Sequence, residues 1–536
     1  MYKIENPIIS GFNPDPSIVR VADDYYIATS TFEWFPGVNI YHSKDLKNWK
    51  LISHPLNTVQ KLDMLGCADS GGIYAPCLSY DEGLFYLVYT NVRNLTGRFW
   101  DCSNYLITAE HIDGPWSEPV YLNGTGIDPS LFHDDDGRKW LVNAVLSHKE
   151  GGKPGFPYWA GIALQEYNPV DKKLIGAPSY IFHGSELGIT EGPHLYKRNG
   201  WYYLLTAEGG TFYNHAVTMA RSKSVHGPYE LDPLNPVMTA RYDCTLPLQR
   251  TGHADLVETQ NGEWYMVHLC GRPLPSKGRS VMGRETGIQR VKWTEDEWLR
   301  LWDDSHIPAM TADGPDLPEH PWETAAIRDD FDKDVLDIQF QNPRIPLTDK
   351  MMSLTERRGY LRLKGHESLS SRHYQSMVAR RQTDYCYEAV TAVDFNPVSF
   401  QQMAGLVCYY DTTNYIYLYV SCDDEKNRVI NLMINDLNQF SELLKEGIRI
   451  PDKCEVYLKV SVYYDMAKFY YSLDQLEWKP VGGYIEYSKL SDEYFKERKQ
   501  ERFTGAFVGI CCQDFTGAHK EADFDFFEYT AADGGK

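Results

Sequence analysis

The chain has 536 residues, more than one hydrophobic core usually fills, so we expect two domains. Its 53 basic residues against 74 acidic ones give a net charge of −21, which disfavours nucleic acid and anionic membranes as partners. An aromatic share of 14% favours β-structure and leaves a neutral ligand compatible with the charge.

Neither a membrane span nor a metal-binding cysteine pattern is present in the sequence. No run of about 18 apolar residues occurs, and the N-terminal residues lack the apolar region of a secretory signal. The eleven cysteines are scattered and odd in number, as expected for reduced, buried thiols. We therefore expect no membrane partner and a cytoplasmic location.

Five copies of one hairpin pattern fill residues 1–312. Each copy has a polar or small residue, often next to a proline, before an apolar run, then a turn rich in Asp, Asn or Gly, then an aromatic residue in a second apolar run. The aromatic positions lie 55 to 63 residues apart and are Tyr25, Phe85, Trp140, Trp201 and Trp264. This period predicts an array of five four-stranded units, a five-bladed β-propeller.

The residues that begin the five copies are expected to start the innermost strands at one end of the propeller axis. They are Asp15, the Tyr74/Ala75 position, Asp128, Glu191 and His253. Side chains about 60 residues apart in sequence would therefore meet in one pocket.

The remaining sequence predicts a linker and a second domain. Residues 313–324 are polar and rich in proline, which is typical of a linker. Residues 325–536 contain long alternating strands, such as residues 414–420, and predict an antiparallel β-sandwich. Helix is expected only around residues 488–499, so the fold class is all-β.

Three carboxylates at matching repeat positions carry the chemistry. Asp15, Asp128 and Glu191 each stand beside Pro or Gly at the start of an apolar run, where such residues are locally unfavourable. Taken singly, each could be a turn or strand-end residue. Two carboxyls across a pocket are what glycoside hydrolysis requires, and a third would raise the pKa of the acid by repulsion.

A further set of residues is expected to bind the ligand. These residues are Arg290, Phe32, Trp34, Tyr74 and His253. A guanidinium can bind sugar hydroxyls and keep a carboxylate ionised, and aromatic rings can stack on a sugar face, although an ion pair or core packing would also explain them. His253 could be a satisfied core residue, a substrate contact or a water-mediated cation site. No cofactor is expected to be required, and a divalent cation is left open.

Several motifs resemble glycoside hydrolase family 43, especially its β-xylosidases. The segments that carry the resemblance are residues 9–38, 126–130, 190–194 and 284–290 in the propeller and residues 329–331 and 402–406 in the sandwich. The resemblance covers nearly the whole chain and implies a concanavalin-like β-sandwich behind the propeller.

The resemblance also implies residue roles for an inverting mechanism. Asp15 would be the general base, Glu191 the general acid and Asp128 the group that tunes and orients Glu191, with base and acid about 6.5–9.5 Å apart. A sandwich loop near residues 513–515, including Phe515, would close the pocket and favour exo cleavage.

The expected activity is release of xylose from the non-reducing end of β-1,4-xylooligosaccharides, by a homodimer or homotetramer. Tyr74 stands where related xylosidases often carry tryptophan, and residues 146–158 do not resemble theirs. An α-L-arabinofuranosidase or a bifunctional enzyme therefore stays an alternative. A non-catalytic carbohydrate-binding propeller is a second one, while a fructan-type hydrolase does not fit the motif around Asp15.

Overall fold

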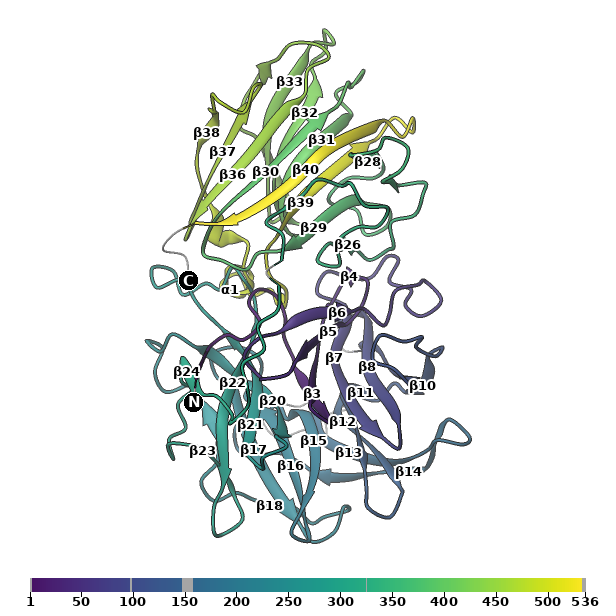
Figure 1. Cartoon of the computed structure of the whole chain (residues 1–536), viewed down its shortest axis with the longest axis vertical. Coiled ribbons are helices and arrows are strands. Elements are labelled where there is room, and N and C mark those ends of the chain that lie inside the picture. The colour runs from purple at the N-terminus through teal and green to yellow at the C-terminus, as the bar shows by residue number, and fades with distance from the viewer. Residues whose placement is uncertain (1, 97–98, 147–157, 324, 533–536) are drawn as a thin grey trace.

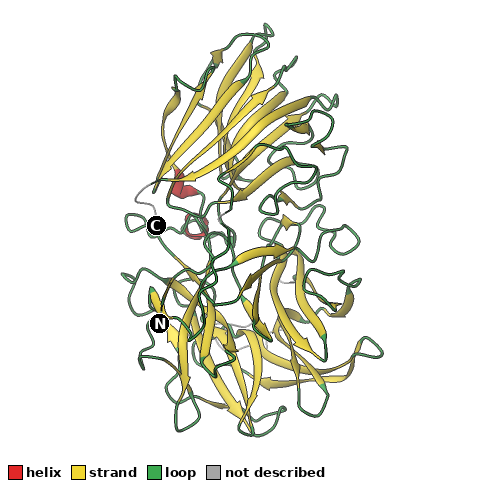
Figure 2. Ribbon diagram, viewed as in Figure 1, coloured by secondary structure: helices red, strands yellow, loops and turns green. Residues whose placement is uncertain are grey.

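The computed structural model describes residues 2–96, 99–146, 158–323 and 325–532. Strands dominate these residues, and their helical elements are the 3-10 turn η1 (Tyr487–Lys489) and the short helix α1 (Asp492–Lys496) (Figure 2). The expected all-β class is confirmed, and the helix expected around residues 488–499 is limited to these two elements. No helix in the described residues has the length and apolar character needed to cross a bilayer.

Five antiparallel sheets form the N-terminal domain, and each follows the chain outward from its first strand. They are β2 (Ser17–Val21), β3 (Asp24–Thr29), β5 (Asn39–Ser43) and β6 (Lys50–Ser53); β7 (Gly72–Asp81), β8 (Leu84–Asn94), β9 (Asp101–Ala109) and β10 (Val120–Asn123); β11 (Gly126–His133), β12 (Lys139–Leu146), β13 (Trp159–Asn168) and β14 (Lys173–Phe182); β15 (Glu191–Arg198), β16 (Trp201–Glu208), β17 (Ala216–Ser222) and β18 (Glu230–Leu231), with β19 (Met238–Thr239) on β17; and β20 (Gln249–Glu258), β21 (Trp264–Gly271), β22 (Glu285–Trp293) and β23 (Leu299–Leu301).

The first strands of the five sheets form a closed ring, which confirms the predicted five-bladed propeller. Each contacts the first strand of the next sheet, and β20 contacts β2. The Asp255 carboxylate fastens this last contact, because its Oδ2 accepts hydrogen bonds from Ser17 Oγ at 3.0 Å and from the Ile18 N–H at 2.8 Å. The turn residues have the predicted geometry: Asn199 and Gly200, between β15 and β16, both have positive φ, as a tight hairpin requires.

The C-terminal domain is a sandwich of two antiparallel sheets (Figure 1). One sheet contains, in spatial order, β27 (Met352–Ser353), β28 (Leu361–Lys364), β40 (Glu521–Ala531), β30 (Cys386–Asp394), β36 (Val456–Tyr463), β37 (Met466–Ser472) and β38 (Lys479–Glu486), with β25 (Arg328–Asp329) on β40. The other contains β29 (Ser376–Arg381), β39 (Phe507–Asp514), β31 (Gln402–Asp411), β32 (Asn414–Cys422), β33 (Arg428–Asp436) and β34 (Gln439–Glu442), with β35 (Ile448–Arg449) on β33.

The central strands of the second sheet are buried on both faces, as β32 shows. Ile416 and Leu418 point into the core between the two sheets. Tyr417 and Tyr419, on the opposite face, belong to a cluster that also contains propeller side chains such as Phe12. Because successive residues of a strand face opposite ways, the alternation read from the sequence serves two different cores.

Short strands close the propeller end of the chain and join it to the sandwich. β1 (Lys3–Glu5) pairs with β24 (Thr311–Asp313) at the end of the propeller, so the first residue of the expected linker, Asp313, lies in a strand. β4 (Trp34–Phe35) pairs with β26 (Asn342–Pro343), which comes from the sandwich side of the chain. The Arg344 guanidinium, itself buried, binds Asp69 of the propeller at 2.7 Å. The domains therefore share hydrogen bonds, an ion pair and an apolar cluster.

Candidate active site

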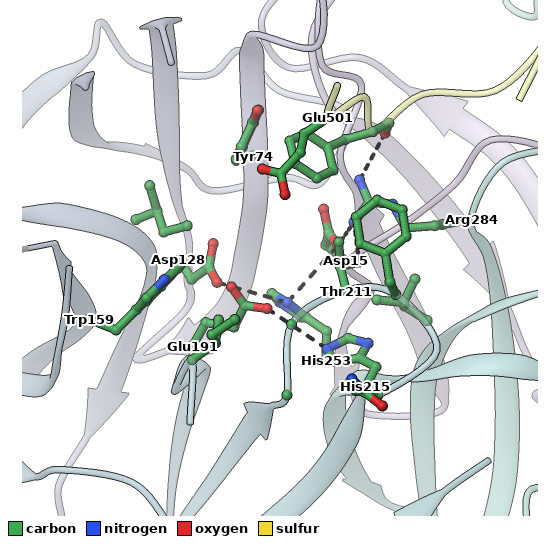
Figure 3. A pocket seen from close by; sticks show the side chains of 18 of the residues that line it. Asp15, Tyr74, Asp128, Trp159, Glu191, Thr211, His215, His253, Arg284 and Glu501 are labelled. Carbon is green, nitrogen blue, oxygen red and sulfur yellow. Dashed lines mark hydrogen bonds and ion pairs between the residues drawn. The ribbon is translucent and has the colours of Figure 1, made fainter. Parts of the chain in front are cut away.

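A cavity of about 740 Å³ opens at the end of the propeller axis that faces the sandwich (Figure 3). Its lining includes the three predicted carboxylates, Asp15, Asp128 and Glu191, together with His253. All four side chains are nine-tenths or nearly so removed from solvent. The repeat pattern therefore brings together residues that are up to 238 positions apart, as His253 and Asp15 are.

Every innermost strand has a left-handed residue just before it or within its first half. The residues with this positive φ are Asp15, Ala75, Asp128, Gly192 and His253. In the second to fifth blades the strand register shifts around the same point, as in a β-bulge, and a bulge re-aims side chains. Non-glycine residues occupy this conformation at a cost of about 1–2 kcal/mol each, which the surrounding ring must offset.

The expected equivalence of the three carboxylates is wrong for Glu191. Gly192 holds the left-handed position of its blade, so Glu191 stands one residue earlier, where Tyr74 stands in the second blade. A Cβ on Gly192 would lie 3.0 Å from Nδ1 of His253, so this position has little room for a side chain. The fourth blade therefore supplies its carboxyl from the preceding residue, which also lines the cavity.

The environment of Asp15 favours the ionised carboxylate. Burial opposes ionisation, but the Arg284 guanidinium lies 3.1 Å from Oδ1 and Ser30 Oγ donates a hydrogen bond to Oδ2 at 2.7 Å. These contacts hold the pKa of Asp15 below its usual value. Asp15 is consequently suited to accept a proton.

The other two carboxyls have the opposite environment. Burial, reinforced by the charge of Asp15, raises the pKa of Asp128 to about 7. Burial and the charges of Asp128 and Asp15 raise the pKa of Glu191 well above its usual value. Asp128 also accepts a hydrogen bond at Oδ2 from the Gly192 N–H at 3.0 Å and so holds the backbone next to Glu191. One pocket thus contains an ionised carboxylate and a protonated carboxyl.

His253, Phe32 and Tyr74 line the cavity, and substrate binding by them stays a prediction. Nδ1 of His253 lies 4.0 Å from both Asp15 Oδ1 and Asp128 Oδ2, and burial lowers its pKa to about 4, so the ring is neutral. The rings of Phe32 and Tyr74 pack against each other with centroids 4.3 Å apart. The Tyr74 hydroxyl donates to the Ser70 carbonyl, which fixes the tyrosine ring in the wall.

Arg290 does not lie in the cavity, and the arginine that does is Arg284. The Arg290 guanidinium binds Glu263 at 3.0 Å and covers the ring of Trp302. Six residues along a strand correspond to about 20 Å, which places Arg290 toward the other end of the blade. Arg284 instead binds Asp15, donates from Nη1 to Thr211 Oγ1 at 3.2 Å and covers the Phe32 ring. The sequence contained both arginines in one motif but did not show which one faces the axis.

Trp34 and Phe515 also lie away from the cavity. Trp34 is 0% exposed and stacks on Phe507 of β39 with ring centroids 3.5 Å apart, so it belongs to the domain interface. β39 runs from Phe507 beside the propeller to its far end, where Phe515 follows and is 43% exposed. Burial in a core and distance along a strand thus exclude these two residues from the pocket.

The sandwich closes the cavity with residues 496–503, rather than with the loop near residues 513–515. Lys496, Glu501 and Phe503 line the cavity. The Phe503 N–H donates to Ser70 Oγ at 3.0 Å, and its carbonyl accepts from Nη2 of Arg284 at 2.9 Å. The sandwich was the correct domain to expect, but the docking of its segments depends on contacts between distant parts of the chain.

Two expectations are not tested by the structure. The segment from 147 to 157, most of the one that departs from the family pattern, lies outside the described residues, although its flanks Leu146 and Tyr158 line the cavity. Among residues 2–96, 99–146, 158–323 and 325–532 no three His, Cys, Asp or Glu side chains are grouped to hold a metal ion. The divalent cation stays a prediction.

A propeller pocket in which one carboxyl is favoured in the ionised form and another in the protonated form contains the pair of groups that glycoside hydrolysis requires. The model of glycosyl hydrolases family 43 matches residues 4–299, and the model of the β-xylosidase C-terminal concanavalin A-like domain matches residues 328–530. The chain therefore belongs to glycosyl hydrolases family 43.

Three relatives are similar over nearly their whole length. A β-xylosidase from Bacillus subtilis is 48% identical over 98% of this chain and 99% of its own, and a xylosidase/arabinosidase 43B from Humicola insolens is 47% identical over 99% and 98%. The crystal structure of a xylan β-1,4-xylosidase from Bacillus halodurans superposes with a TM-score of 0.96 at 52% identity, over 98% of this chain and 100% of that one. These likenesses confirm the concanavalin-like sandwich and the glycoside hydrolase class.

Replacing Arg284 by Gln is expected to move the acid limb of the pH profile of kcat/KM upward. The substitution removes the positive charge that holds the Asp15 carboxylate ionised, so the pKa of Asp15 should rise by about 1 unit or more. The measurement is kcat/KM on a nitrophenyl glycoside as a function of pH. Arg290→Gln is the matched control and should leave the limb in place, and an unmoved limb in Arg284→Gln would refute the assignment.

Proposed function

We propose that the chain is an exo-acting β-xylosidase that releases xylose from the non-reducing end of β-1,4-xylooligosaccharides. The observation that carries the proposal is the opposite ionisation of Asp15 and Glu191 in one cavity that the sandwich closes on one side. A cavity of about 740 Å³ falls in the range of pockets for small ligands, about 300–1,000 Å³. Such a pocket suits the end of a short oligosaccharide better than the middle of a polymer.

The proposed mechanism is a single displacement by water. Asp15 is the general base and takes a proton from the water that attacks the anomeric carbon. Glu191 is the general acid and gives its proton to the oxygen of the leaving sugar. Asp128 holds the backbone beside Glu191 and, by repulsion, keeps the acid protonated before the reaction. Arg284 keeps the base ionised through its contact with Asp15.

The two roles predict different responses to the leaving group. Glu191→Gln should lose about 10²–10⁴-fold in kcat on xylobiose and far less on a dinitrophenyl β-xyloside, because a good leaving group needs no acid. Asp15→Ala should be nearly inactive on both substrates. The control is Asp135→Asn, which changes a carboxyl at an exposed turn, and its rates on both substrates should be unchanged. A Glu191→Gln enzyme that retained most of its activity on xylobiose would show that another residue is the acid.

Direct attack by water predicts inversion at the anomeric carbon. The sugar first formed from a β-xyloside should be α-xylose, which then mutarotates to the equilibrium mixture. Proton NMR during the first minutes of hydrolysis distinguishes the two anomers. First-formed β-xylose would instead require a covalent intermediate and would exclude the proposed roles.

The sugar preference is tested by comparing two nitrophenyl glycosides. The β-xylosidase names of two relatives support xylose, whereas the name of the Humicola enzyme supports a bifunctional xylosidase/arabinosidase as the second candidate. We expect kcat/KM on nitrophenyl β-xyloside to exceed that on nitrophenyl α-L-arabinofuranoside by at least about tenfold. Equal values would favour the bifunctional enzyme, and a reversed ratio the arabinofuranosidase.

Assembly and location complete the proposal. The dimer or tetramer expected from the size and the appended sandwich stays a prediction, as does the cytoplasmic location. Two observations favour catalysis over the alternative of a non-catalytic binding propeller. The chain belongs to a family of glycosyl hydrolases, and all three carboxyls line the cavity.

A further inference from the structure

A second buried histidine, His215, faces the carboxyl of Glu191 from the cavity wall (Figure 3). Its Nε2 lies 3.9 Å from Oε1 of Glu191 and has no hydrogen-bond partner among the described residues. The side chain is 1% exposed, so water does not satisfy this nitrogen from outside the cavity. A buried polar atom without a partner beside a reacting group is an observation that the mechanism above does not use.

The tautomer of His215 is fixed by its other nitrogen. Nδ1 lies 3.0 Å from the backbone carbonyl of Arg250. A carbonyl oxygen can only accept, so Nδ1 carries the hydrogen and Nε2 of the neutral ring presents a lone pair. Burial lowers the pKa of His215 to about 3, so the ring is neutral at the pH where the enzyme is expected to work. The contact with Glu191 is therefore not an ion pair.

The orientation of His215 is held from two sides. A Cβ on Gly252 would come within 2.5 Å of the imidazole, so the glycine backbone packs directly against the ring. Arg250, which supplies the carbonyl, is completely buried and binds Asp492 at 2.8 Å and Glu493 at 3.1 Å, both in α1 of the sandwich. The sandwich thus anchors the residue that fixes the histidine.

We propose that His215 is a positioning residue that keeps the proton on Glu191 in the free enzyme, with its tautomer set by Arg250 and the two acids of α1. The inference rests on the proposed role of Glu191 as the general acid. The separation of 3.9 Å is longer than a hydrogen bond, so in this structure the lone pair of Nε2 acts as a partial negative charge facing Oε1. It repels the negative charge of the ionised carboxyl, and it accepts the proton of the acid form when the two side chains approach each other. Both effects favour the protonated carboxyl.

The charged and titratable groups around His215 come from four elements. Arg250 and His253 belong to β20, Arg284 lies just before β22, Asp15 precedes β2, and Glu191 begins β15. Arg284 is bound to Asp15, and His253 is itself neutral, so neither competes for the lone pair of His215. Glu191 is the carboxyl that Nε2 faces at short distance.

His215→Phe should move the alkaline limb of the kcat/KM profile on xylobiose to lower pH. Phenylalanine fills the site without a lone pair, so the pKa of Glu191 should fall by about 0.5–1 unit, the size expected when one polar acceptor facing the carboxyl is removed. The alkaline limb of kcat/KM reports the acid of the free enzyme. The shift should be accompanied by a larger loss on xylobiose than on dinitrophenyl β-xyloside, a split that a purely structural defect would not produce.

The matched control is His268→Phe. His268 is equally buried, its Nδ1 lies 3.0 Å from the Leu269 carbonyl, and its ring packs on Gly287, but its Nε2 faces Gln289. This variant should lose stability without moving the limb. A second pair of variants adds one methyl group against each imidazole: Gly252→Ala pushes on His215 and Gly287→Ala pushes on His268. Only Gly252→Ala should shift the alkaline limb.

Two outcomes would overturn the inference. An unmoved limb in both His215→Phe and Gly252→Ala, or an equal shift in the His268 and Gly287 controls, would show that His215 has only a structural role. Glu191→Gln separates this failure from failure of the proposed acid. If Glu191→Gln abolishes the alkaline limb while His215→Phe leaves it unmoved, only the inference on His215 fails. If Glu191→Gln keeps the limb, the acid assignment fails and the inference fails with it.

Discussion

The active site depends on one backbone constraint, the left-handed residue that each innermost strand has just before it or in its first half. At this residue the chain lies in the ring formed by five contacting strands, and its backbone conformation directs a side chain toward the axis. Asp15 and Asp128 occupy this conformation although it is unfavourable for residues with a Cβ. The hydrogen bonds and apolar contacts of the ring offset the strain, so the stability of the whole propeller is what holds the two carboxyls in place at the cavity.

Unequal access to one cation then separates the carboxyls chemically. Arg284 lies against Asp15, while Asp128 and Glu191 have burial and negative neighbours. In water the three carboxyls would have similar pKa values. In this pocket their pKa values are spread over a wide range of pH. The position of each carboxyl, rather than its residue type, therefore decides its role. Asp15 is the ionised group, whereas Asp128, also an aspartate, has a raised pKa.

The sequence predicted the fold well because its signals are local and repeated. Turn residues and aromatic spacing define each hairpin without reference to distant contacts, and so the ring and its axial carboxyls followed. The residues that were misplaced depend on long-range geometry. Arg290 and Arg284 differ only in how far along a strand they stand, and Phe503 rather than Phe515 meets the cavity because of how two domains dock. His215 left no signal in the sequence. It stands just before β17, 24 residues after Glu191 at the start of β15, and only folding of the blade brings the two side chains within 3.9 Å.

The hydrogen bond from Arg284 to the Phe503 carbonyl also bears on how such enzymes diversify. The guanidinium that sets the acidity of Asp15 takes part of its own orientation from the backbone of the other domain. A gene fusion that exchanged one sandwich for another would alter the acidity of the water-activating group along with the shape of the pocket mouth. The two domains therefore form one catalytic unit, and a different sandwich would have to place a backbone carbonyl at the same position to keep this hydrogen bond.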